Sequence, residues 1–563
     1  MRRLGHVMTS VAMVIVLAPA GPGALAQVPS RCSGLRPLRP ADTAARPYQS
    51  EGWPGRAYGA LQEGVRSAAA DDACAYQSEC RPGGPYGALK TVLAADPIEA
   101  SIREVRKAVN AQRDGSHLSR LFSLRQLRDP ALRALLLPLA EHPQWQVQVH
   151  AILGLAEIDP DGHVDPALIL RVGARAQEQV IANALDLELI GVEQIRMLAA
   201  AKYMAPLPQV LLVGELVLLG EPVDLERLAA LATSADVRIA GLASCLAAQL
   251  GDAAALGAYE SRLESLGRRD RNRHVLWLLP AIRQYRLGRT LPWVLQLLSE
   301  PDLEPEVAYA ALLTVLQLDT RTGLEHWKQL LGPSPSHRRR VRYGLLLLVS
   351  GAEIPAAAYD PLAPDEPLIE AMVRTGKALA GGSDVAEALT HLVDLGHGKT
   401  SEWALGATRD LDDDQAARVY LHLIDRVEGD RRSQGQRVSQ AITATSRLFE
   451  LNPQLVLERL TAAEDDGLTQ QAILLGLFDS RSPAAGQAAQ LVKRIGAGRA
   501  DSLALTLIAK HAASLDPDEL RDLALIAQGG GRLSAVLQVQ AAWLYLRHTQ
   551  SIDRAVAQIF GGA

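Results

Sequence analysis

The 563-residue sequence is poor in aromatic residues and lacks any long hydrophobic run. Phe, Trp and Tyr make up 4% of the chain, whereas apolar residues as a whole make up 48%. The core must therefore come from Ala, Leu, Val and Ile. Because Ala and Leu favour helices while aromatic residues favour strands, this composition predicts a helical protein. No apolar run reaches about 18 residues, so we expect no transmembrane span.

Motifs that mark common catalytic and metal sites are also missing. HExxH, GxSxG and SxxK do not occur. His391 and His397 form the closest histidine pair, but their spacing does not put them on one helical face. GHGKT (396–400) ends like a phosphate-binding loop, yet Val393 stands where that loop needs glycine. We therefore predict no metal site, no cofactor and no catalytic residues.

The formal net charge of −5 gives the chain no overall attraction to nucleic acid, so we expect no nucleic-acid partner. Basic residues cluster in GRRDRNRH (267–274) and SHRRRVRYG (336–344). Each cluster is either a solvated turn or a surface for an acidic partner. The candidate binding residues of the second cluster are Arg338, Arg339, Arg340 and Arg342. A third charged stretch, DLDDDQAARVY (410–420), is interpreted as a helix N-terminus in preference to a calcium loop, whose ligand spacing is missing.

The first 26 residues have the pattern of a secretory signal peptide. Two arginines precede the apolar segment VAMVIVLAPAG (11–21), and Ala24-Leu25-Ala26 forms a cleavage site. We expect export to the periplasm or the cell exterior. In that oxidising environment Cys74 and Cys80 are expected to form a disulfide, although Cys32 is an alternative partner for either. Cys245 lies in an apolar helical pattern and is expected to be a buried free thiol.

One unusual phrase occurs twice, as PYQSEGWPGRAYGAL (47–61) and AYQSECRPGGPYGAL (75–89). Each copy has a Pro-Gly turn signal and leads into a helical stretch. The copies are either turns that cap the end of a helical array or loops whose aromatic side chains bind a partner. A third alternative is that the region orders only on binding. The candidate binding residues are Tyr48, Trp53, Tyr58, Tyr76 and Tyr86.

From about residue 118, short amphipathic helices alternate with brief polar breaks. DPALRALLLPLAEHP (129–143) is followed by QWQVQVHAILGLAEID (144–159), for example. Asp-Pro pairs predict helix starts, and glycines such as Gly251 predict helix ends. Helical pairs of this kind bury their apolar faces only against adjoining pairs, which predicts a solenoid. The expected molecule is an elongated stack that exposes broad flanks.

Two of these segments resemble the second helix of HEAT repeats. They are HPQWQVQVHAILGLAEID (142–159) and SADVRIAGLASCLAAQLGD (234–252), while PEVAYAALLTVLQL and SHRRRVRYGLLLLVSG are looser copies. The resemblance implies an all-α, irregular HEAT-like superhelix, with an atypical Pro/Gly/Tyr-rich N-terminal region. The expected parts are a signal peptide (1–26), the duplicated region (27–100), a first solenoid half (101–351), a Pro-rich joint (352–367) and a second half (368–563).

The expected function is that of an exported scaffold, not an enzyme, that binds a protein or an extended polymer of the cell envelope along its surface. Two alternatives remain open. One is a polysaccharide lyase or hydrolase on an α-toroid scaffold, which the low aromatic content disfavours. The other is a structural envelope component with no discrete ligand. The sequence leaves the oligomeric state open.

Overall fold

The computed structural model describes residues 96–110, 115–351, 354–381, 384–395, 399–427, 434–463, 467–480, 482, 484–495, 502–529 and 535–561. Every regular element in these ranges is an α-helix or a short 3-10 helix, which confirms the all-α prediction. The predicted signal peptide and the duplicated phrase lie outside the described residues. The candidate residues Tyr48, Trp53, Tyr58, Tyr76, Tyr86, Cys74 and Cys80 therefore lie outside them too.

The helices follow one another along the whole described chain. The α-helices are α3 (Pro97–Val109), α4 (Ser116–Gln126), α5 (Arg133–Leu139), α6 (Trp145–Ile158), α7 (Pro166–Arg171), α8 (Ala174–Asp186), α9 (Val192–Ala200), α10 (Pro206–Leu219), α11 (Leu225–Ala232), α12 (Val237–Leu250), α13 (Ala253–Glu264), α14 (Arg268–Gln284), α15 (Leu291–Leu298), α16 (Pro305–Leu318), α17 (Thr320–Leu331), α18 (His337–Ser350), α19 (Pro367–Gly381), α20 (Val385–Leu395), α21 (Lys399–Ala407), α22 (Asp413–Asp425), α23 (Gln434–Leu451), α24 (Pro453–Ala462), α25 (Leu468–Asp479), α26 (Ala485–Ile495), α27 (Ser502–His511), α28 (Pro517–Ala527), α29 (Ala535–Thr549) and α30 (Ile552–Phe560). The 3-10 helices are η3 (Pro130–Leu132), η4 (Gly288–Thr290), η5 (Ala356–Leu362) and η6 (Thr408–Asp410).

The helices are arranged in two layers. The even-numbered helices from α4 to α18 contact one another in succession. Several of them, such as α10 and α12, are buried around most of their circumference. Odd-numbered helices such as α11 and α17 are amphipathic and bury only one side. Nearly all the buried apolar side chains belong to one continuous core, as expected when each unit is covered by its neighbours.

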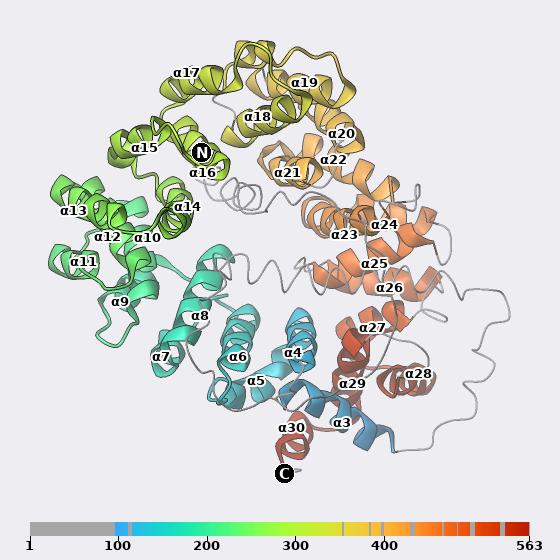
Figure 1. Cartoon of the computed structure of the whole chain (residues 1–563). Coiled ribbons are helices and arrows are strands. Elements are labelled where there is room, and N and C mark those ends of the chain that lie inside the picture. The colour runs from blue at the N-terminus through green and yellow to red at the C-terminus, as the bar shows by residue number, and fades with distance from the viewer. Residues whose placement is uncertain are drawn as a thin grey trace, which may run out of the picture.

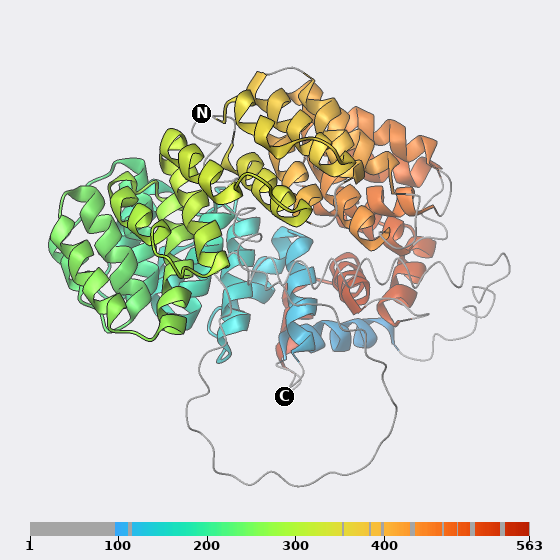
Figure 2. The same cartoon turned by 45° about the horizontal axis from the view of Figure 1, so that its top comes forward.

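The two ends of the described stack meet. Helices α3 and α4 pack against α29, α3 also contacts α28 and α30, and α5 contacts α30. The helices therefore follow a closed ring, with the blue first helices beside the red last ones (Figure 1). A turned view shows the same neighbours (Figure 2). The predicted stack of helical units is therefore not elongated but curves back on itself, because the small rotation between successive units accumulates until the terminal apolar faces cover each other.

The described part of the Pro-rich segment, residues 354–367, belongs to the stack. It contains η5, whose Tyr359 and Leu362 side chains are buried. Helix α19 packs against both η5 and α18, so the core continues through this segment. At the other predicted boundary, helix α3 extends across residues 100 and 101.

Tyrosine rings packed on helical glycines bring neighbouring helices close together. A Cβ added to Gly376 of α19 would lie 2.1 Å from the Tyr359 ring. The Tyr285 ring makes the same contact with Gly214 of α10, and the Tyr259 ring with Gly241 of α12; an added Cβ would lie 2.6 Å away in both cases.

Gly376→Ala is therefore expected to lower the free energy of unfolding by about 1–3 kcal/mol, because the Tyr359 ring has to move out of a packed core. Gly257→Ala in α13 is the matched control, since an added Cβ there meets nothing within 4 Å. The control should be neutral or slightly stabilising, because alanine is the better helix former. Urea unfolding followed by circular dichroism measures both. Equal effects of the two substitutions would contradict this packing.

Candidate binding sites and the ring seam

Three of the four candidate arginines on α18 contact other parts of the ring. Arg339 donates to the Leu330 carbonyl at the end of α17. Arg342 donates to the Pro305 carbonyl at 3.2 Å and lies 4.7 Å above the Tyr309 ring. Arg338 is exposed.

The remaining candidate, Arg340, connects α18 to the segment before α19. Its guanidinium donates to the Ala363 carbonyl at 2.9 Å and pairs with Asp365 and, at 3.2 Å, with Glu366. Its side chain is only 11% exposed. The basic cluster therefore does not form a single free surface. Most of its arginines instead form hydrogen bonds or ion pairs with neighbouring units.

Similar contacts, in which an arginine guanidinium donates to backbone carbonyls of the neighbouring unit, recur among the odd-numbered helices. Arg227 of α11 donates to the carbonyls of Ala200 and Ala201 at the end of α9. Arg262 of α13 donates in the same way to the carbonyls of Ser234 and Ala235, just after α11. The last carbonyls of a helix have no intrahelical partner and carry partial negative charge. The planar fork of arginine can satisfy two of them at once.

The same fork joins the two ends of the chain. Arg106 of α3 donates to the carbonyl of Gln558 at 2.6 Å and to that of Ile559 at 3.1 Å, at the end of α30. We call the contact of α3, α4 and α5 with α28, α29 and α30 the seam. The seam thus contains the same arginine-to-carbonyl hydrogen bonds that join consecutive units elsewhere in the ring.

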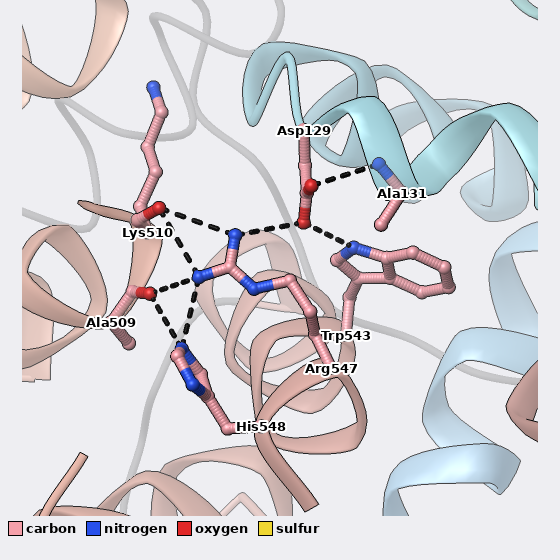
Figure 3. Close-up of polar contacts among 7 residues, drawn as sticks. All are labelled: Asp129, Ala131, Ala509, Lys510, Trp543, Arg547 and His548. Carbon is pink, nitrogen blue, oxygen red and sulfur yellow. Dashed lines mark hydrogen bonds and ion pairs between the residues drawn. The ribbon is translucent and has the colours of Figure 1, made fainter. Parts of the chain in front are cut away.

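A buried carboxylate lies at the centre of the seam (Figure 3). Asp129 accepts hydrogen bonds from the Trp543 indole at 3.0 Å, the Arg547 guanidinium at 3.1 Å and the Ala131 amide at 3.0 Å. Trp543 is fully buried, and Asp129 is 6% exposed. Arg547 also donates to the carbonyls of Ala509 and Lys510 of α27. One side chain from α29 therefore holds together segments from both ends of the chain.

Two basic side chains of α27 lie beside this network. The Lys510 ammonium donates to the Phe478 carbonyl at 2.7 Å. Burial, and to a smaller extent Arg128, lower the pKa of Lys510 to about 7. Burial and Lys510 lower the pKa of His511 to about 4. Both groups are therefore more easily deprotonated in the folded ring than in the unfolded chain.

These shifts predict that lowering the pH destabilises the folded protein at α27, beside the seam. His511 binds its proton near pH 6.5 when unfolded but near pH 4 when folded, so its contribution to stability falls as pH drops from 6.5 to 4. The contribution of Lys510 falls in the same direction, from pH 10.5 to 7. The slope of the unfolding free energy against pH measures how many protons the chain takes up when it unfolds. Between pH 4 and 6.5, His511→Gln should therefore lower this number by up to about one. Urea unfolding at several pH values measures this slope, and identical slopes for the two proteins would contradict the prediction.

A surface hollow lies between α22 and α24. It has a volume of about 470 Å³. Its lining residues are Asp413, Asp414, Ala417, Arg418, Leu421, Leu451, Asn452 and Leu455. We call this hollow the groove. Asp412 caps α22 by accepting from the Gln415 amide at 2.8 Å, which confirms the interpretation of this acidic stretch as a helix N-terminus.

Comparison with known proteins gives no relative. The chain matches no family model, no curated protein and no solved structure.

Within the described ranges, no three His, Cys, Asp or Glu side chains gather closely enough to hold a metal ion. None of the described helices is long and apolar enough to cross a membrane. Cys245 is a buried free thiol, as expected, and burial raises its pKa.

A second, smaller crevice contains several carboxylates. Glu260, Glu264 and Glu300 line it together with Arg271 and Trp293. Burial and Glu264 raise the pKa of Glu260, whereas Glu300 pairs with Arg271. Its volume of about 40 Å³ is well below the roughly 300–1,000 Å³ of typical small-molecule sites.

Proposed function

We propose that the protein is an exported, HEAT-like helical scaffold that binds a partner protein on its surface. Export is inferred from the N-terminal pattern, and the family from the quoted repeat segments. The observation that carries the proposal is the seam. Because the ends are joined, the units of the ring hold fixed positions relative to one another. A partner can then contact several units without the cost of ordering a flexible array.

The chemistry of the described surface supports binding. Three of the candidate binding residues on α18, Arg339, Arg340 and Arg342, contact neighbouring units, which leaves the groove as the stronger candidate surface. The groove is open and combines apolar with charged lining residues, as protein-binding surfaces do. A protein partner fits this mixture better than a glycan, whose recognition relies mainly on stacked aromatics and hydrogen bonds.

Affinity capture from an envelope extract tests the proposal. The bait is the mature chain from residue 27, compared with a version that begins at Asp96 and keeps every described helix. We expect a defined protein to be enriched over a control bait of unrelated exported helical protein. Partners kept by the shorter bait place binding on the ring, and partners lost place it on the duplicated phrase. Enrichment of nothing over the control would contradict the scaffold function.

A further inference from the structure

The groove lies between helices that run in the same direction. Its lining comes from the first two-thirds of α22, from Leu451 at the end of α23 and from the start of α24. Farther along, Asp425 at the end of α22 pairs with Arg459 of α24 at 2.9 Å. The N-terminal halves of the two helices therefore face each other across the hollow, and their C-terminal halves are joined by an ion pair.

The groove has an apolar floor that no described segment covers fully. Leu451 is 42% exposed, which is unusual for a large apolar residue in this ring. Leu421 and Leu455 are half-buried beside it. Covering such side chains with another apolar surface is favourable by roughly 25 cal/mol for each Å² removed from water.

The rim of the groove is acidic. Asp413 and Asp414, in the first turn of α22, are both exposed. Arg418 is the one basic residue in the lining, so the lining has a net charge of −1. A ligand that fills the groove would therefore gain from an apolar part over the leucines and a cationic part near the two carboxylates.

We propose that the groove binds a segment of the partner protein in which lysine or arginine stands next to aliphatic residues. This inference rests on the proposed scaffold function and names the chemistry of its partner. The net negative charge of the lining disfavours phosphate and anionic lipid headgroups, and the leucine floor offers little to a glycan. A basic and apolar peptide segment satisfies both halves of the groove.

Fluorescence anisotropy with defined peptides tests this directly. The probe is a labelled peptide with two Lys-Leu pairs, GSKLKLSG, added to the intact mature chain. Replacing its lysines by glutamate, or its leucines by serine, should each weaken binding by about tenfold. Binding of the lysine peptide should also weaken as salt is raised, because the rim carboxylates are exposed.

Matched variants locate the binding. Asp414→Lys should lower the affinity for the lysine peptide by about tenfold. Asp553→Lys, which changes an exposed acidic residue in the first turn of α30, should leave it unchanged. Leu455→Ser should also weaken binding, and circular dichroism checks that each variant remains folded. Equal affinity for lysine and glutamate peptides, or full affinity in Asp414→Lys, would overturn the proposal.

Two further outcomes would overturn the proposal for the groove without overturning the proposed scaffold function. If Asp414→Lys abolishes self-association of the chain in sedimentation, the occupant is a second copy and the partner segment is wrong. Lys202 and the 78% exposed Tyr203 are the basic and apolar pair that a second copy would offer. Partners captured equally by Asp414→Lys would overturn the groove proposal but leave the scaffold proposal standing.

Discussion

Replacing Trp543 by alanine is expected to lower the free energy of unfolding by about 3–5 kcal/mol. The side chain is fully buried in the seam, and removing a large aromatic residue from a core leaves a cavity. The substitution also removes a hydrogen bond from the buried carboxylate of Asp129, which adds about 1–3 kcal/mol. Urea unfolding followed by circular dichroism measures the total.

Trp403→Ala in α21 is the matched control, because Trp403 is equally buried but lies away from the seam. Both substitutions should destabilise the protein. Hydrogen exchange distinguishes them, since only Trp543→Ala should speed exchange in α3 and α4 at the other end of the chain. Unchanged protection of α3 and α4 in Trp543→Ala would show that the seam does not hold the ends together.

Arg125→Met is expected to cost about 3–5 kcal/mol of stability. The Arg125 guanidinium pairs with both carboxylate oxygens of Glu157, at 2.7 and 3.0 Å, and lies 3.1 Å from Nδ1 of His150. Both charged side chains are at most 6% exposed. Removing the cation leaves an uncompensated carboxylate between α4 and α6, which is far more costly than losing an exposed pair.

Arg196→Met is the control for this ion pair. Arg196 pairs with Glu193 and with Glu221 on the surface, where each partner is screened by water. Its loss should cost less than about 1 kcal/mol. Replacing Arg125 and Glu157 together by Met and Leu should recover part of the loss, because no charge then remains buried. Equal losses for Arg125→Met and Arg196→Met in urea unfolding would contradict the burial of this pair.

Local features of the fold could be predicted because their causes lie within a few residues. Asp165 accepts from the Ala167 amide at the start of α7, as the Asp-Pro pair predicts. Asp516, in another Asp-Pro pair, begins α28 and forms a capping box with Glu519. Gly251 ends α12 with a φ of 116°, a left-handed conformation that favours glycine. Helix type and helix ends therefore followed from periodicity and caps.

The ring closure could not be predicted, because its causes are not local. Asp129 is the N-cap that the sequence predicts, but its bond to Trp543 joins residues 414 positions apart. Whether such residues meet depends on the summed rotations of all the units between them. No short sequence motif determines that sum, so the sequence predicts a stack of helices but not its closure into a ring.

The charge clusters show the same limit. The sequence identifies Arg340 as part of a basic run but not that the Ala363 carbonyl accepts its hydrogen bond. Any residue can supply a carbonyl, so this partner leaves no pattern in the sequence. The groove likewise combines Asp413 with Leu451, from a separate helix. The acidic half was visible as a helix N-terminus, whereas its apolar neighbour was not.

The distance between the first and last described helices tests the ring most directly. Spin labels at Arg103→Cys on α3 and Ala557→Cys on α30, with the other accessible cysteines replaced by serine, report it by pulsed electron paramagnetic resonance. Both positions are exposed and lie within one helical turn of the contact between Arg106 and Gln558. The axes of packed helices are about 8–10 Å apart. The ring therefore predicts a narrow distribution of label-to-label distances, centred at only a few times that spacing. A broad distribution at much longer distances would contradict the closed ring.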